Sequence, residues 1–407
     1  MPRGKDLISP LTLINALEFL ESVFICLLPV ALVTSITLTG ILIFSGASIF
    51  AILYLSGRKK LNLDNEVFQT LNSAFMLYIF VFTFTKFVNS GLSEGINALF
   101  RYCQDYFVFA WVMFYVLKKD QNTNHIKNAI LVAGIISVIY GLLQFFHLDI
   151  FDRQAIHHRI SGFHKNPYSY AGQLIIFVFF FLSLLSESKN KLFYLLLLTC
   201  TIFCVLNSSE RAVIFGIAIA IVIYFCLNKV STKNIFLISG LTLISLILTA
   251  IFNHTVLNRI RNVFFPGKNI KPNSRLKLWG IAIALWKKNM LFGAGTFPKI
   301  YHETSDLFTF KIWTHAHNVY LQILVTNGIL GLISYLYLFY SFIRVLLWNL
   351  SKSKYSSCLI SIIIAFFIEG IFEYFWGDSE VKYLLLYFSG FVFGYLAMLS
   401  LKEGEKV

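Results

Sequence analysis

Long apolar segments recur along the whole chain and leave it few ways to fold in water. Twelve are long enough to cross a bilayer, at 22–38, 40–56, 68–89, 99–117, 128–147, 168–186, 192–208, 211–227, 234–252, 318–343, 356–373 and 382–400. Charged residues make up only 13% of the 407 residues, about half the share of a soluble domain. Because unpaired backbone groups cannot face lipid, the spans are expected to be helices. The sequence therefore predicts an all-α polytopic membrane protein with about twelve transmembrane helices.

Basic residues in the termini and short loops predict the orientation. Seventeen of the 34 Lys and Arg residues fall on one side of the predicted spans. Short cytoplasmic loops are enriched in Lys and Arg, so this side is predicted to be cytoplasmic, with both termini inside. Residues 1–252 would then hold the first nine spans, with a short outer loop at 148–167. Residues 253–317 would form a large outer loop containing short helices, and 318–407 the last three spans and a cytoplasmic C-terminus.

The large outer loop is strongly basic. Residues 253–316 carry ten Lys and Arg residues against Glu303 and Asp306. One interpretation is that the loop only lies near anionic lipid headgroups, because long loops escape the charge rule. The other is that it collects a polyanionic substrate at the outer surface. Within it, Asn273 and Ser274 are typical of a helix start, and a helix with tryptophan and lysine is predicted to lie in the interface.

Two arginines are candidates for binding an anion. Arg211 begins the eighth predicted span, where free helix amides attract anions, and Ser208 and Ser209 add hydroxyl donors. Its guanidinium offers a two-pronged donor for phosphate oxygens. The alternatives for Arg211 are a topological anchor or an ion pair with the adjacent Glu210. Arg275 is the second candidate, at the start of the predicted interfacial helix.

A histidine at the end of the large loop is the candidate base. His317 is followed by Asn318 and precedes an apolar helix with Gly328 and Gly331. A lone histidine at a helix end is most often structural or merely exposed. Near arginines that hold a phosphorylated lipid, however, an unprotonated imidazole can take a proton from a hydroxyl.

Other residues form a second set of candidates. Glu369 and Glu373 lie one helical turn apart near the outer end of the eleventh span, and intramembrane carboxylates are usually functional. Together with Asp378 and Glu380 in the next outer turn, they are expected to orient the histidine, pair with an arginine or contact sugar hydroxyls. The second set comprises Arg159, Lys165, His315, Asn318, Glu373, Asp378 and Glu380. The outer face has few acids, so we expect no divalent metal site. We expect no cofactor either.

Two predictions concern helix packing. Arg101 and Asp105, four residues apart, are predicted to form a buried ion pair in the fourth span. Gly390 and Gly394 are typical of close helix contact in the twelfth.

These motifs together resemble those of the bacterial O-antigen ligase / O-antigen polymerase superfamily of polytopic glycosyltransferases. The similar elements are Ser208-Ser-Glu-Arg211-Ala, Ser274-Arg275-x-x-x-Trp279, Leu291-Phe-Gly293-Ala-Gly295, His317-Asn318 followed by Gly328-x-x-Gly331, and Arg159-Ile-Ser-Gly162-Phe-His-Lys-Asn166-Pro167. The resemblance covers roughly residues 150–345. Each motif alone is loose, and their order and common side make the set specific.

The resemblance implies a reaction at the outer leaflet of the bacterial inner membrane. A glycan on undecaprenyl pyrophosphate is transferred to a hydroxyl of the lipid A–core by a metal-independent, inverting mechanism. His317 is implied as the base, and Arg211 and Arg275 as the groups that bind the pyrophosphate. The implied partners are the lipid-linked donor, the lipid A–core acceptor and membrane lipids, with no nucleic acid.

Two alternatives remain open from the sequence. A polymerase would use a second lipid-linked repeat unit as acceptor, and the single large late loop favours a ligase over it. A flippase or other transporter of lipid-linked glycan would place polar groups near the midplane and in repeats. The candidates here cluster at one face instead.

Overall fold

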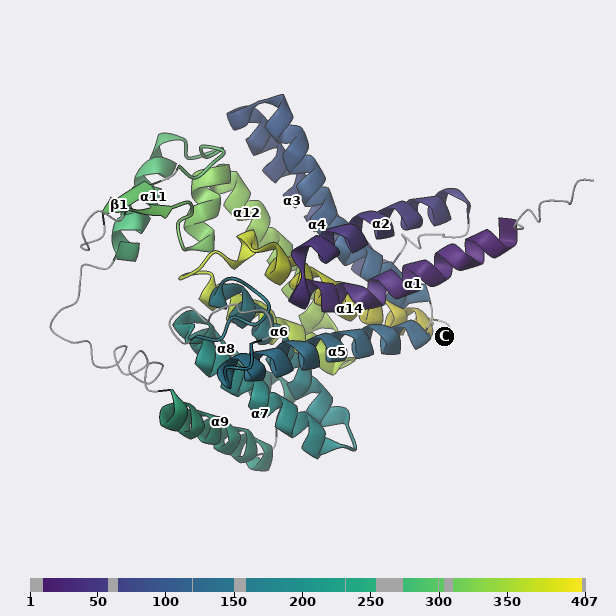
Figure 1. Cartoon of the computed structure of the whole chain (residues 1–407). Helices are drawn as coiled ribbons and strands as arrows, with labels where there is room; N and C mark the ends of the chain where they lie inside the picture. The colour runs from purple at the N-terminus through teal and green to yellow at the C-terminus, as the bar shows by residue number, and fades with distance from the viewer. Residues whose placement is uncertain are drawn as a thin grey trace, which may run out of the picture.

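The computed structural model describes most of the chain as a bundle of helices (Figure 1). The described residues are 10–57, 65–118, 120–149, 159–230, 232–253, 274–298, 300–303 and 310–404. The predicted loop helix lies inside the described part of the chain. The basic residues of the loop that precede this helix, Lys268 among them, lie outside the described part.

Helices coincide with all twelve predicted apolar segments. In chain order they are α1 Pro10–Thr34, α2 Ile36–Leu55, α3 Glu66–Ser90, α4 Leu92–Lys118, α5 Asp120–Phe145, α6 Pro167–Glu187, α7 Lys191–Ser208, α8 Arg211–Asn228, α9 Thr232–Phe252, α12 Val319–Trp348, α13 Lys354–Glu369 and α14 Ser379–Gly404. The large loop contributes α11 Ser274–Lys288. A short 3-10 helix, η2 Phe375–Gly377, precedes α14.

Nine of the described helices are long and apolar enough to cross a membrane: α1, α2, α3, α5, α6, α7, α8, α12 and α14. Of the other three, α4 carries Arg101 and Asp105, α9 has a shorter apolar stretch at Ile238–Phe252, and α13 has 16 residues. The prediction of a helical polytopic membrane protein is therefore confirmed, while the number of twelve spans stays a prediction.

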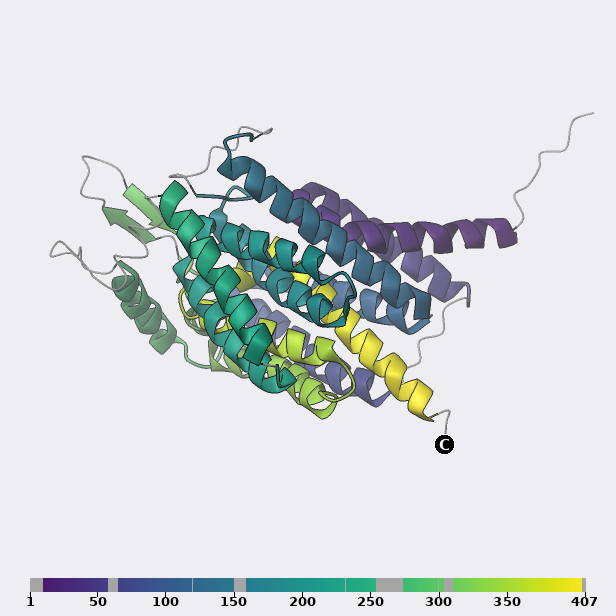
Figure 2. The same ribbon diagram turned by 90° about the horizontal axis from the view of Figure 1, so that it is seen from below.

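The large loop contains a small sheet that the sequence did not predict. Strands β1 Ile300–Glu303 and β2 Phe310–Trp313 pair antiparallel, with Ile300 opposite Trp313. In both views the strands lie at one end of the bundle and the C-terminus at the other (Figures 1 and 2). The expectation of a purely α-helical chain was wrong in this segment, because two four-residue strands give too short an alternation to stand out in a sequence.

Two helix boundaries also differ from those expected. The first helix begins at Pro10 rather than residue 22, and it ends where Ser35 caps α2 by accepting a hydrogen bond from the Leu38 amide. The eleventh predicted span ends at Glu369 rather than 373, so that Glu373 lies in the turn between α13 and η2. That shorter helix decides where the Glu373 carboxylate points.

The centre of the bundle is built around α14 and α6, most of whose residues are buried. The backbones of α14 and α4 pack closely at Gly390 and Gly394. A Cβ on Gly390 would lie 2.4 Å from the Phe109 carbonyl oxygen, and one on Gly394 would lie 2.8 Å from that of Met113. The predicted helix-contact role of these two glycines is confirmed.

The helix after the candidate histidine is broken at Gly328. Its backbone has φ 67° and ψ −166° inside α12, a conformation open to glycine. The break frees the carbonyls of Val325 and Thr326, which accept hydrogen bonds from the amides of Ala294 and Gly295 at 2.6 and 3.0 Å. The segment after α11 is therefore fixed to the middle of α12.

Asp105 has a different partner from the one predicted. Its carboxylate lies 2.7 Å from the Lys382 ammonium of α14, with both side chains buried. Arg101 is exposed on the surface of α4. The prediction of a buried ion pair at Asp105 is confirmed, but the choice of Arg101 was wrong because spacing within one helix says nothing about a neighbouring helix.

Replacing Lys382 with Met should destabilise the protein, because it leaves the Asp105 carboxylate buried without its cation. We expect a loss of about 3–5 kcal/mol, measured as a lower Tm of the purified protein in detergent. Lys402→Met on the same helix is the control, since Lys402 and Asp120 are 48% and 62% exposed and such pairs contribute little. An equal loss in both variants would contradict the proposed weight of the buried pair.

Candidate active site

The start of α12 is tied to the turn that follows α13. Asn318 caps α12, its side-chain oxygen accepting a hydrogen bond from the Leu321 amide at 2.9 Å. Its side-chain nitrogen donates to the Ile371 carbonyl at 2.8 Å, and the Val319 amide donates to the Gly370 carbonyl at 2.7 Å. Residues 317 and 373 are therefore neighbours although 56 positions separate them.

His317 itself occupies a strained backbone conformation. Its φ of 46° lies in the left-handed region, which few residues other than glycine and asparagine adopt easily. The His317 amide donates to Nδ1 of His315 at 3.3 Å, and the rings of the two histidines lie 4.0 Å apart. This arrangement holds the His317 side chain at a definite angle to α12.

The neutral form of His315 suits that contact. Burial lowers the pKa of the His315 imidazole to about 4, with His317 adding to the shift and Glu373 opposing it. At neutral pH His315 is therefore uncharged, and with Nδ1 accepting from the His317 amide its proton lies on Nε2. We infer that His315 positions His317 and does not itself carry charge.

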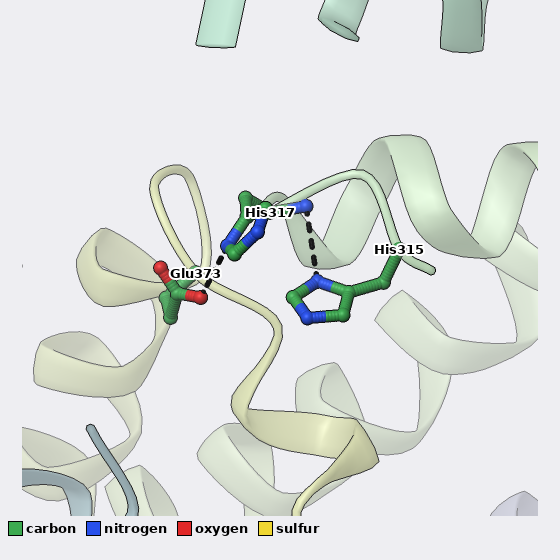
Figure 3. Close-up of side chains that lie close together, drawn as sticks. All are labelled: His315, His317 and Glu373. Atoms are coloured by element: carbon green, nitrogen blue, oxygen red, sulfur yellow. Dashed lines mark hydrogen bonds and ion pairs between the residues drawn. The ribbon is translucent and has the colours of Figure 1, made fainter. Parts of the chain in front are cut away.

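Glu373 contacts both the histidine and an arginine, and Figure 3 shows its carboxylate directed at the His317 ring. One oxygen of its carboxylate lies 2.6 Å from Nδ1 of His317, and the other lies 3.2 Å from a terminal nitrogen of Arg275. The Glu373 side chain is 10% exposed, so its carboxylate is largely shielded from solvent, whereas the Arg275 side chain is 35% exposed. A carboxylate at Nδ1 keeps the proton there and leaves Nε2 of His317 as the acceptor.

Packing of α11 against α12 places Arg275 at this carboxylate. Leu278 and Ala282 of α11 are buried, and Ala282 packs with Ala316 and Val325. Arg275 lies in the first turn of α11, within reach of the turn after α13. The predicted loop helix thus carries Arg275 to the candidate base.

Arg211 reaches the same place from another direction. Ser209, at φ 58°, closes a tight turn between α7 and α8, and Arg211 is the first residue of α8. The Ser208 hydroxyl donates to the Val205 carbonyl at 2.6 Å and is used within its own helix. The Ser209 hydroxyl is buried and has no hydrogen-bond partner among the described residues.

A cavity of about 280 Å³ joins these groups. It is lined by Arg159, Tyr168, Ser209, Glu210, Arg211, Ala212, Arg275 and Glu373. Three guanidinium groups face two carboxylates, which gives the lining a formal charge of +1, and the N-terminus of α8 adds positive potential. The cavity therefore suits a small polyanion.

Arg159 is committed to an ion pair with Glu210. Both side chains are about nine-tenths buried, and Nε of Arg159 also donates to the Ser208 carbonyl at 2.8 Å. The alternative that Glu210 neutralises the adjacent Arg211 is therefore wrong. Arg159 fixes the turn that presents Arg211. The Arg159 guanidinium lies over the ring of Tyr168, which also lines the cavity.

The remaining sequence candidates lie outside the cavity lining. Lys165 is exposed in the turn before α6, and Asn318 serves as the cap of α12. Asp378 accepts a hydrogen bond from the Ser169 hydroxyl at 3.0 Å, and Glu380 accepts one from Ser379 at 3.3 Å. Burial raises the pKa of Asp378 to about 6; the Ser169 hydrogen bond lowers it and the charges of Glu380 and Glu373 raise it.

The cluster also has the composition of a metal site. His315, His317 and Glu373 each place one possible ligand atom within 4.8 Å of the others. The Arg275 guanidinium, however, occupies the second oxygen of Glu373 and would repel a cation there. The expectation of a metal-free site stays a prediction.

Two features of the site were not singled out from the sequence. Tyr168 lines the cavity, directly after the Arg159–Pro167 motif, and an aromatic residue there gave no signal of its own. Orienting the histidine and pairing with an arginine were both among the expected roles of the outer carboxylates, but that Glu373 does both at once was not predicted, because its two partners come from other segments.

Part of the chain matches a known family. Residues 193–336, about a third of the length, match the model of a family described as O-antigen ligase. The matched segment contains Arg211, Arg275 and His317 and ends before Glu373. The predicted resemblance to the O-antigen ligase and polymerase superfamily is confirmed by this match. No curated protein sequence matches the chain.

Inorganic pyrophosphate should bind the purified protein in this cavity. We expect Arg211→Gln to weaken binding about 10- to 100-fold, the effect of losing charge-assisted hydrogen bonds. Arg211→Lys should fall between, because a point charge replaces a two-pronged donor. Titration calorimetry measures the affinities, and exposed Lys288→Gln is the control. Equal affinities for Arg211→Gln and Lys288→Gln would contradict the assignment.

Proposed function

We propose that this protein, whose residues 193–336 match the O-antigen ligase family, is an O-antigen ligase. In this proposal it transfers a glycan from undecaprenyl pyrophosphate to a hydroxyl of the lipid A–core during lipopolysaccharide biosynthesis. The observation that carries the proposal is the Glu373 carboxylate, which contacts both a candidate base and a cation of the anion cavity.

The donor pyrophosphate would occupy the cavity lined by Arg211 and Arg275. Its volume of about 280 Å³ is close to the lower end of the roughly 300–1,000 Å³ usual for small-molecule sites. That size fits a diphosphate with the first part of its substituents better than a whole glycan. The partnerless Ser209 hydroxyl and the first amides of α8 supply further donors for its oxygens.

His317 would activate the acceptor. Its Nδ1 faces Glu373, so the lone pair on Nε2 can take the proton of the attacking hydroxyl. The side chain is 23% exposed, which leaves it accessible to a sugar. Once protonated, the imidazolium is stabilised by the Glu373 carboxylate, as an aspartate stabilises the histidine of a hydrolase triad.

The reaction would then be a single displacement. The acceptor oxygen attacks the anomeric carbon, the bond from that carbon to the phosphate oxygen breaks, and the electron pair leaves with the pyrophosphate. Arg211 and Arg275 stabilise the charge that develops on the leaving group. Pyrophosphate leaves without a strong general acid, so one base and two cations suffice.

The proposal places this chemistry on the outer side of the bacterial inner membrane, with both termini in the cytoplasm. It follows from the predicted orientation, because the start of α8, α11 and the start of α12 belong to the same end of the bundle. Residues 253–317 are then the periplasmic loop, between transmembrane segments at 1–252 and 318–407.

Deletion of the gene followed by lipid analysis tests the proposal against its nearest alternative. A ligase leaves unmodified lipid A–core and accumulates long glycans on the lipid carrier. Core bearing single repeat units would instead identify a polymerase, and a carrier-linked glycan that fails to reach the outer leaflet would identify a flippase.

Replacing His317 with Asn should abolish glycan transfer. Asparagine tolerates the left-handed backbone of residue 317 but cannot act as a base, so the variant separates chemistry from folding better than alanine. We expect at least a 100-fold loss, the lower range of general-base effects. Lipopolysaccharide gels and membrane protein levels measure the result. Normal O-antigen bands from the variant would contradict the role of His317.

A chelator should leave transfer unchanged. Arg275 opposes a cation at Glu373, and the proposed step uses only protein groups and the pyrophosphate. The transfer rate of the purified protein in EDTA is compared with that in buffer. Loss of activity that zinc or manganese restores would show that His315, His317 and Glu373 hold a metal.

A further inference from the structure

A second cavity lies at the opposite end of the bundle from His317. It measures about 530 Å³ and opens between the end of α6, the start of α7, the end of α8 and the starts of α9 and α13. That volume lies within the roughly 300–1,000 Å³ of ligand sites. None of its lining residues belongs to the candidate active site.

The packing of α9 explains why this space is open. Of the neighbouring helices, α9 packs mainly on α7, while α8 packs mainly on α13. At the active-site end, Asn207 of α7 donates to Thr249 and accepts from Asn253, which holds that end of α9 close. At the other end the cavity lies between the two helix pairs, and α9 lies at the margin of the bundle (Figure 1).

The walls of the cavity are mainly apolar. They are formed by Leu182, Leu185, Leu195, Phe225 and Ile238, from four different helices. These helices are of membrane-spanning type or, for α9, carry a shorter apolar stretch. A hydrocarbon chain can therefore lie along these walls without exposing them to water.

Three lysines surround the mouth of the cavity. Lys191 begins α7, Lys229 follows the last residue of α8, and Lys354 begins α13. All three are exposed, and no Asp or Glu is among the described residues that line the cavity. The mouth thus carries a formal charge of +3 above an apolar wall.

The apolar walls and the three lysines each argue against one class of ligand. A soluble anion would not require apolar walls of this extent, and a neutral lipid would not require three ammonium groups. Lysines on this side are expected from the positive-inside rule, but that rule does not place them around one cavity. Basic pockets between transmembrane helices on the cytoplasmic side suit anionic lipid headgroups.

We propose that this cavity binds an anionic phospholipid, with its phosphate at Lys191, Lys229 and Lys354 and an acyl chain along α7 and α9. On the predicted orientation this is a lipid of the cytoplasmic leaflet. The site is separate from the glycan-transfer site and does not depend on the function proposed for that site.

Native mass spectrometry of the full-length protein in detergent tests this site. Cardiolipin and phosphatidylglycerol are the probes, with phosphatidylcholine as the neutral lipid and glycerol 3-phosphate as the soluble anion. We expect retained adducts of the two anionic lipids only. The triple variant Lys191→Gln, Lys229→Gln, Lys354→Gln should weaken their binding about 100-fold, from roughly a factor of five for each lysine.

A second triple variant controls for the loss of charge. Lys118→Gln, Lys127→Gln and Lys352→Gln remove the same charge from the same predicted side and spare the cavity. It should bind the anionic lipids as the wild type does. Leu195→Trp fills part of the cavity from its apolar wall and should weaken the binding of the lipids, while all three lysines stay in place. Equal losses in the two triple variants, equal binding of phosphatidylcholine, or binding of glycerol 3-phosphate as tight as that of the lipids would overturn the proposal.

Discussion

The site depends on one carboxylate. Glu373 lies 2.6 Å from the imidazole of His317 and 3.2 Å from the guanidinium of Arg275, so the proposed base and a proposed phosphate-binding cation contact the same carboxylate. The carboxylate is in place because α13 ends early and the following turn is bonded to the start of α12, through Val319 and Asn318. This turn therefore brings together three side chains that come from distant parts of the chain.

The rest of the bundle serves to bring helix ends together. The tight turn at Ser209 presents Arg211 and the first amides of α8. The buried ion pair of Arg159, in the loop before α6, with Glu210 fixes that turn. The break at Gly328 gives the segment after α11 free carbonyls to bind, which secures α11 against α12. The groups proposed to bind the anion therefore come from helix termini, an arrangement that would reduce reorganisation if charge develops on a leaving group there.

Much of this was accessible from the sequence, and the limits have physical causes. Apolar length predicted the transmembrane helices. Their ends indicated Arg211 and His317 as candidates, and the start of the predicted loop helix indicated Arg275. The structure places these three residues around one carboxylate and its cavity. Pairings between distant segments were not accessible: Asp105 with Lys382 and Glu210 with Arg159 replaced the local partners Arg101 and Arg211. Local spacing reveals which residues share a helix face, but only packing shows which helices meet. The β1–β2 hairpin escaped for another reason, because its strands are too short for a periodic signal.

The stereochemistry of the transferred glycan tests the central claim most directly. In the proposed reaction, His317 activates the acceptor hydroxyl while Arg211 and Arg275 hold the departing pyrophosphate. The acceptor oxygen must then attack the anomeric carbon from the face opposite the phosphate oxygen that leaves. Nuclear magnetic resonance of the purified product, compared with the lipid-linked donor, reports the configuration at that carbon. The account predicts inversion at every transfer. Retention would contradict the single in-line displacement built on Glu373 and His317.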